Sequence, residues 1–163
     1  MGVTDDLATI ARQERDLRFD AFDEDMAWRL GSIVRDRAAA AGWPAVIDIR
    51  SFARPLFLSA LPGSAPDNVD WTRRKGNVVQ RYHRSSYAIG LELQAKGGTL
   101  ESRYGLPAAD YADHGGAVPI AVRGTGVIGS ATISGLPQRE DHAVMMHALA
   151  TLLGVPPIEL PAA

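Results

Sequence analysis

The stretch GGAVPIAVRGTGVIGSATISG, from Gly115 to Gly135, decides the fold of this chain. Apolar or small side chains stand at every second position on both sides of a central Arg-Gly-Thr-Gly segment: Val118, Ile120 and Val122 before it, and Val127, Gly129, Ala131 and Ile133 after it. A period of two is typical of strands with one buried face. Gly124 and Gly126 permit the positive φ angles of a tight turn. The stretch therefore predicts a β-hairpin.

The same glycines match a different motif, because Gly124 to Gly129 has the G-x-G-x-x-G pattern of dinucleotide-binding turns. That fingerprint works only where the glycine turn opens a helix whose N-terminal amides face a pyrophosphate. Here the alternating, β-branched sequence VIGSATIS follows the turn. The hairpin interpretation is therefore favoured over a dinucleotide site.

A second hairpin is predicted earlier in the chain. Ala45, Ile47 and Ile49 alternate with other residues, and Pro55 to Leu61 fits a partner strand because proline is acceptable at a strand's first position. Hairpins over residues 45–61 and 117–134 together predict an antiparallel sheet. Amphipathic patterns predict five helices. The first starts near Thr4, and the second runs from its N-cap Asp23 to Ala41. The third has Asp70 as its N-cap and covers 71–84, and the last two cover 87–97 and 140–153. The expected fold is α+β, with helices packed on the sheet.

Length and composition limit the class of protein. The 163 residues fit a single domain over 1–163 with an irregular C-terminal tail at 155–163, and 46% hydrophobic with 22% charged residues is ordinary for a globular chain. A net charge of −2 gives no general signal for nucleic acid. The absence of cysteine excludes disulfides, thiolate nucleophiles and iron–sulfur clusters. With no signal peptide or long apolar run, we expect a cytoplasmic protein without a membrane partner.

A cationic stretch is the second informative feature. Between Trp71 and Leu91 the chain has five basic residues and no acidic one: Arg73, Arg74, Lys75, Arg81 and Arg84. In one interpretation this is a solvated or intersubunit face whose charges meet acids such as Glu92 or Glu101. In the other it binds a small anion, because clustered guanidinium groups hold carboxylate or phosphate bidentately. The candidate ligand-binding residues are then Arg73, Arg74, Lys75, Asn77, Arg81, His83, Arg84, Ser85 and Ser86.

Several of these segments carry a family resemblance. Gly115-Gly116, the Pro-Ile strand, the glycine hairpin, Ile133-Ser134-Gly135 and the helix start at Asp141 resemble the closing motif of the HbpS/GlcG-like family, the haem-degrading domain. The segments VIDIRSFARPLF, TRRKGNVVQRYHRSSY and SGLPQREDH look closest to an uncharacterised cytoplasmic, UPF-type branch of it. The resemblance implies a profilin-like fold, ring-like homo-oligomers and haem chemistry.

Haem iron needs an axial ligand, and haem propionates favour basic partners. His83 is the best-placed candidate, because it lies between Arg81 and Arg84; the other histidines are His114, His142 and His147. His142 and His147 are five residues apart on a helix and diverge, so they are poor partners for one metal. No catalytic residue is identified, and whether the protein is an enzyme stays open.

The alternative function belongs to another class. A ring-forming adaptor without small-molecule chemistry would use the cationic helix and Trp28, Trp43 and Trp71 as contacts to protein partners. Arginine and tryptophan are enriched at such contacts.

Overall fold

The protein was analysed as a computed structural model that describes residues 2–163. A four-stranded antiparallel sheet has the strand order β2-β1-β4-β3. The elements in chain order are α1 (Val3–Asp16), α2 (Glu24–Ala41), β1 (Val46–Ser51), β2 (Pro55–Ala60), α3 (Pro66–Tyr82), α4 (Ser86–Lys96), α5 (Leu100–Tyr104), β3 (Ala117–Val122), β4 (Gly126–Ser134) and α6 (Gln138–Leu153). The predicted α+β class and both predicted hairpins are confirmed.

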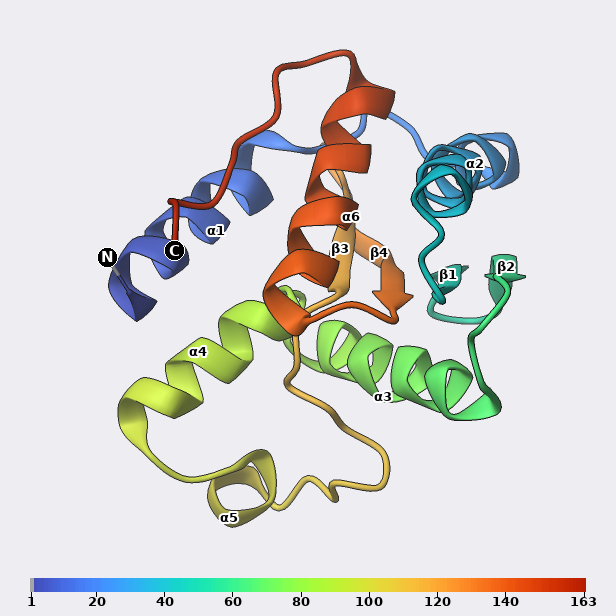
Figure 1. The fold of residues 1–163 in the computed structure, drawn as a ribbon. Helices are drawn as coiled ribbons and strands as arrows, with labels where there is room; N and C mark the ends of the chain where they lie inside the picture. Colours follow the sequence, from blue (N-terminus) through green and yellow to red (C-terminus); the bar gives the residue numbers. More distant parts are fainter. Residues whose placement is uncertain (1) are drawn as a thin grey trace.

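Helices cover both faces of this sheet (Figure 1). α2 and α6 pack on one face, where Ile47, Ile49 and Ile133 belong to the main hydrophobic core. α3 packs on the other face, mainly against β4 and β3. α3 and α6 therefore contact different side chains of the sheet.

The alternation along β4 assigns its residues to these two faces. Ala131 and Ile133 enter the core beneath α6, whereas Ser130 and Thr132 point toward α3. A Cβ placed on Gly76 of α3 would lie 3.4 Å from Ser130 Oγ and 3.9 Å from Thr132 Oγ1. A methyl group at this mid-helix position would thus make ordinary contacts with the buried polar face of β4.

A β-bulge changes the prediction for Val127. Ile120 of β3 is opposite Gly129, but the next residue, Ala121, is opposite Val127, so Ile128 is an extra residue on β4. Ile128 packs against the main core, and Val127 lines a cavity on the opposite side. The expectation that Val127 shares the core face was wrong because the bulge reverses the alternation there.

The boundaries of α3 and α6 differ from the predictions, and α5 was not predicted as a helix. α3 begins at Pro66, so Asp70 lies inside the helix and is not its N-cap, and α3 ends at Tyr82 instead of Arg84. The segment expected as a connector, 99–104, contains the short helix α5, with Thr99 as its N-cap. α6 begins at Gln138, two residues before the predicted start at Glu140. Proline at the start of α3 is a helix-opening signal that the acidic residue at 70 obscured.

The C-terminal segment 155–163 has no helix or strand but is tied to the helices. Gln13 Nε2 on α1 donates a hydrogen bond of 2.6 Å to the Ile158 carbonyl, and its Oε1 lies 2.8 Å from His142 Nε2 on α6. Arg139 donates to the Pro161 carbonyl and forms a bidentate pair with Asp6. Within residues 2–163, no helix is long and apolar enough to span a bilayer.

Two helix glycines make a matched pair for a stability test. A Cβ on Gly31 of α2 would lie 2.4 Å from the Phe57 ring, whereas the Cβ contacts at Gly76 are ordinary. We expect Gly76→Ala to raise the free energy of unfolding by up to about 1 kcal/mol through helix propensity. Gly31→Ala should lower it by about 1–3 kcal/mol through overpacking. Urea denaturation of both variants measures the difference, and equal effects would contradict the described packing.

Candidate functional site

The most deeply buried ion pair joins Lys75 on α3 to Asp141 on α6. Their side chains are 4% and 1% exposed, and Lys75 Nζ lies 3.1 Å from Asp141 Oδ2. The same amine donates to the Ile133 carbonyl at 3.3 Å. Asp141 also accepts hydrogen bonds from the backbone amides of Gly135 and Leu136. The pair therefore connects α3, the end of β4 and the start of α6.

Burial perturbs both members of this pair. Desolvation lowers the pKa of Lys75, although the neighbouring carboxylate of Asp141 opposes the shift. Desolvation raises the pKa of Asp141 to about 6, although Lys75 and the two backbone amides oppose it. Both shifts favour the neutral forms, so proton transfer between the two groups costs less here than in water. Perturbed groups of this kind beside a cavity are candidates for function.

The residues that carried the family resemblance converge on this pair. A Cβ on Gly116, whose φ is 135°, would lie 2.4 Å from the Ile133 carbonyl oxygen and 2.9 Å from Lys75 Nζ. A Cβ on Gly115 would lie 2.2 Å from the Gln138 carbonyl oxygen. The glycine pair thus lets the chain pass between β4 and α6 close to the lysine amine.

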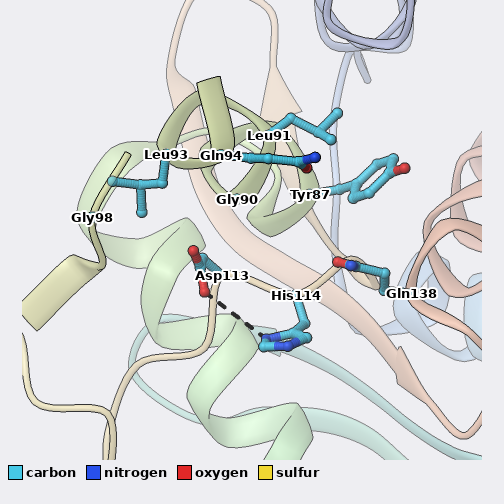
Figure 2. A pocket seen from close by; sticks show the side chains of 9 residues that line it. All are labelled: Tyr87, Gly90, Leu91, Leu93, Gln94, Gly98, Asp113, His114 and Gln138. Atoms are coloured by element: carbon cyan, nitrogen blue, oxygen red, sulfur yellow. Dashed lines mark ion pairs between the residues drawn. The ribbon is translucent and has the colours of Figure 1, made fainter. Parts of the chain in front are cut away.

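A cavity of about 290 Å³ opens beside the pair. We call it the lysine cavity; it is lined by Asn68, Trp71, Lys75, His114, Ser134, Gly135, Leu136, Gln138 and Asp141. The His114 ring packs edge-on against Trp71, with ring centroids 5.1 Å apart. A second cavity of about 260 Å³, drawn in Figure 2, lies against α4 and shares His114 and Gln138 with the first. Polar side chains from three parts of the chain therefore meet here.

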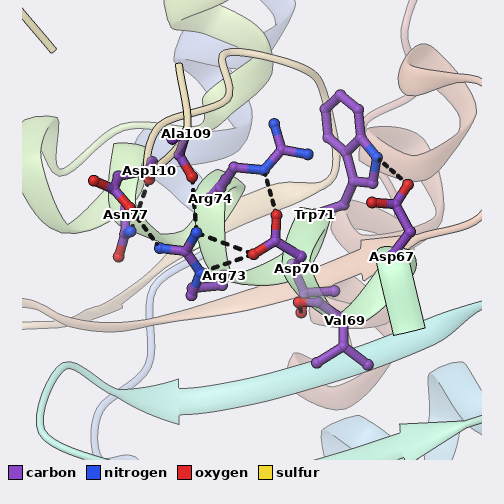
Figure 3. Close-up of polar contacts among 10 residues, drawn as sticks. Asp67, Val69, Asp70, Trp71, Arg73, Arg74, Asn77, Ala109 and Asp110 are labelled. Atoms are coloured by element: carbon purple, nitrogen blue, oxygen red, sulfur yellow. Dashed lines mark hydrogen bonds and ion pairs between the residues drawn. The ribbon is translucent and has the colours of Figure 1, made fainter. Parts of the chain in front are cut away.

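The other charges at the start of the cationic stretch are neutralised locally (Figure 3). Arg73 forms ion pairs of 3.0 Å with Asp70 and with Asp110. Arg74 pairs with Asp70 at 2.8 Å and lies over the Trp71 ring, 4.0 Å from its centroid. Asn77 donates to the Asp110 carbonyl at 2.8 Å. Arg73 and Asn77 therefore hold the loop around Asp110 against α3, whereas the Arg74 side chain is paired within α3.

The two predicted serines are buried and bonded to backbone. Ser85 is the N-cap of α4, where its Oγ accepts from the Ala88 amide at 3.3 Å. Ser86 Oγ accepts from the Ala117 amide at 3.1 Å. Arg81 is exposed beside Tyr82 at the end of α3. The nine predicted ligand-binding residues therefore do not form one continuous face.

His83 and Arg84 meet Arg15, at the end of α1, and Arg18, just beyond it, around a third cavity of about 370 Å³. We call it the arginine cavity; it is lined by Ala11, Glu14, Arg15, Arg18, His83, Arg84, Pro119, Ala121 and Val127. Arg84 also pairs with Glu92, one of the acids expected to meet the cationic stretch. Burial raises the pKa of Glu14 to about 7, although Arg84 and the Ser85 amide oppose the shift. Arg15, Arg18, Arg84 and His83 thus line one cavity together with Glu14, although Arg15 also pairs with its neighbour Asp16 at 2.8 Å.

His83 has a geometry that leaves its imidazole accessible. It is the C-cap of α3 with φ of 55°, and its exposed ring stacks on Phe52 with centroids 5.8 Å apart. No hydrogen bond from its ring nitrogens to another of residues 2–163 was found. By contrast, His142 is fully buried, and burial lowers its pKa to about 3. Among the described residues, no group of three or more His, Asp or Glu side chains is arranged to hold a metal ion.

Sequence reasoning missed part of each cavity. Arg15 lies in the last turn of α1 and Arg18 lies beyond the end of this helix at Asp16, so helix spacing does not relate the two residues. The available signal for the arginine cavity was the run of basic residues Arg12, Arg15 and Arg18. Nothing local indicated that these residues meet His83, because α1 and the α3–α4 junction are far apart in sequence. Asp141 was noted as part of a motif, but its contact with Lys75 depends on a separation of 66 residues.

Comparison with known proteins places these residues in a family. The model for the family described as haem degrading protein HbpS-like matches residues 22–150. A UPF0303 protein of Burkholderia mallei is 57% identical over 154 residues, which is 94% of this chain and 93% of the relative. The crystal structure of the Ybr137w protein has a TM-score of 0.84 at 30% identity, covering 91% of this chain and 87% of that one. A structure titled as a complex of PduOC with heme has a TM-score of 0.68 at 18% identity, covering 85% and 99%, and supports the fold alone.

The pKa of Glu14 gives a testable pH dependence. Because burial raises it, the folded state favours the protonated carboxyl, and this contribution to stability is lost as pH rises through about 7. Glu14→Gln keeps an acceptor for the Ser85 amide but does not titrate. The measured quantity is the difference in unfolding free energy between Glu14→Gln and wild type, from urea denaturation. As the pH rises from about 5 to about 8, we expect this difference to change by about 1–2 kcal/mol in favour of the variant.

Glu101→Gln, which makes the same chemical change at an exposed position, is the control for this experiment. A pH-independent difference between Glu14→Gln and wild type would contradict the burial of Glu14.

Proposed function

The chain belongs to the HbpS-like family of haem-degrading proteins, and on that premise we propose that it binds a small anionic ligand, haem first among the candidates, in the arginine cavity. The observation that carries the proposal is the convergence of Arg15, Arg18 and Arg84 with His83 around about 370 Å³. Convergent guanidinium groups bind carboxylates through charge-assisted hydrogen bonds. The cationic stretch contributes to the site through its C-terminal end.

The side chains of the arginine cavity suit the chemical parts of haem. His83 offers an imidazole as axial ligand, and the arginines offer partners for the propionates. Ala121 and Val127 add apolar surface for the porphyrin. Haem bound there would supply iron redox chemistry. The role of this chain would be to hold the iron through His83, orient the propionates and limit access of water.

Glu14 is the residue of the arginine cavity whose charge disfavours binding of an anion. Above its pKa of about 7 the ionised carboxylate repels a negatively charged ligand, and below that pH the repulsion is relieved. Ligand binding is therefore linked to proton uptake by Glu14. Glu14→Gln should bind an anionic ligand more tightly than wild type above neutral pH.

A titration with haemin and with metal-free protoporphyrin IX tests the two parts of the site separately. Arg15→Glu with Arg18→Glu should weaken binding of both porphyrins by about 10- to 100-fold, because charged hydrogen bonds contribute about 1.5–3 kcal/mol each. His83→Ala should weaken haemin and shift its Soret band, but leave protoporphyrin IX unchanged. The readouts are haem absorbance and protoporphyrin fluorescence.

A charge-matched control lies on α2, where Arg29 and Arg35 are exposed and line none of the cavities described above. The Arg29→Glu, Arg35→Glu variant should bind both porphyrins like wild type. Absence of saturable binding to wild type, or equal loss in both double variants, would overturn the assigned site.

A non-catalytic adaptor that forms homo-oligomers is the second candidate function, and two exposed apolar side chains favour it. Trp28 on α2 is 66% exposed and Leu58 on the edge strand β2 is 56% exposed. Large exposed apolar side chains are typical of contacts to another protein chain. Trp28→Ser and Leu58→Ser, made separately and together, should reduce the assembly mass in light scattering if either side chain joins copies of the chain. An unchanged mass in all three variants would exclude that role.

A further inference from the structure

Nearly all of the basic residues in this chain are arginine. Among 17 basic residues only Lys75 and Lys96 are lysine, and the others are arginine. Lys96 is exposed at the end of α4, whereas Lys75 is buried beside the lysine cavity. Arginine stays charged in proteins, but lysine loses its proton when it is desolvated. The buried cationic position is thus occupied by lysine, whose side chain, unlike that of arginine, can become a neutral amine.

The surroundings of Lys75 resemble those of a reactive amine. Asp141 Oδ2 lies 3.1 Å from Nζ, which is within the range for direct proton transfer. The Ile133 carbonyl at 3.3 Å fixes the amine in place, and the absence of a side chain at Gly116 leaves room for it. Arg74, held over the Trp71 ring, adds a positive charge that disfavours a second cation at Lys75. A desolvated lysine near another cation is a known arrangement for an amine nucleophile.

We propose that Lys75 captures a small aldehyde or ketone in the lysine cavity as an imine, with Asp141 carrying the proton. The site is distinct from the arginine cavity and does not require haem or an anion there. The volume of about 290 Å³ restricts the ligand to a small molecule. Asn68, His114 and Gln138 supply polar groups around it, and Trp71 supplies a flat apolar surface.

The reaction is balanced without an oxidant or reductant. The ammonium of Lys75 gives a proton to Asp141, and the neutral nitrogen attacks the carbonyl carbon to form a C–N bond. The carbonyl oxygen takes up one of the two protons on the attached nitrogen and becomes a hydroxyl group. Asp141 gives its proton to this hydroxyl as the C–O bond breaks and water leaves. The nitrogen then passes its remaining proton to the Asp141 carboxylate, which leaves a neutral imine, a protonated Asp141 and one molecule of water.

Because the chain has two lysines, the exposed Lys96 serves as an internal control for Lys75 in the test. Wild-type protein and the Lys96→Arg variant are incubated with propanal or with pyruvate, treated with borohydride, digested and mapped by mass spectrometry. The reduced secondary amine is expected on Lys75 with at least one of the two compounds. Labelling of Lys75 in wild type should exceed that of Lys96, because desolvation lowers the pKa of Lys75 and so increases the fraction of free amine. Use of both probes reports whether a carboxylate on the ligand is favoured.

Two further samples separate a reactive amine from a purely structural ion pair. Protein unfolded in urea before addition of the carbonyl compound should label Lys75 and Lys96 equally. Asp141→Asn, checked for folding by circular dichroism, should lower labelling of Lys75 because it removes the proton carrier. No adduct at Lys75 in folded wild type, or labelling no greater than at Lys96, would overturn the proposal whatever the variant does.

Discussion

The buried contact between Lys75 and Asp141 is the interaction on which the arrangement of α3, the sheet and α6 depends. Removing two charges from water is costly, and the structure offsets this cost with the ion pair and hydrogen bonds from the Gly135 and Leu136 amides. Those amides belong to the turn between β4 and α6. The carboxylate therefore fixes the direction in which α6 leaves the sheet. A side chain at Gly116 would enter the space of this pair, and one at Gly115 would meet the Gln138 carbonyl oxygen, so both positions require glycine.

The two cavities that we assign to function lie at different ends of α3. Asn68, Trp71 and Lys75 of its N-terminal half face the lysine cavity, and His83 and Arg84, just beyond its C-terminus, face the arginine cavity. Between them, Arg73 and Asn77 are occupied in holding the loop around Asp110. A single run of cationic sequence thus serves three purposes, and only the local partner of each side chain distinguishes them.

Much of the fold follows from local patterns. Strand alternation was sufficient for both hairpins, together with Pro55 for the 45–61 hairpin and turn glycines for the 117–134 hairpin, and the helix from Asp23 to Ala41 has clear cap residues. Val127 could not be assigned correctly, because a bulge is set by pairing with β3 and leaves no signal in the alternation. The helix at Asp70 was misplaced because an acidic residue that pairs with Arg73 and Arg74 resembles an N-cap in sequence.

The candidate site was less predictable than the fold, for a physical reason. Whether an arginine binds a ligand depends on whether an acid already neutralises it, and Asp110 reaches Arg73 from 37 residues away. Likewise, Lys75 was included among nine candidates for its charge, whereas its burial against Asp141 gives it a different chemistry. The family motif includes this region, because its Gly116 and Asp141 lie beside that amine.

The most direct test of this account is a double-mutant cycle on the unfolding free energy with Lys75→Met and Asp141→Asn. Each single change leaves one buried charge without its partner and should cost about 3–5 kcal/mol. The double variant has neither charge, so we expect it to be no less stable than either single variant, with a coupling energy of about 2 kcal/mol or more. Single effects that add to within about 0.5 kcal/mol would contradict the claim that this pair organises the fold around the lysine cavity.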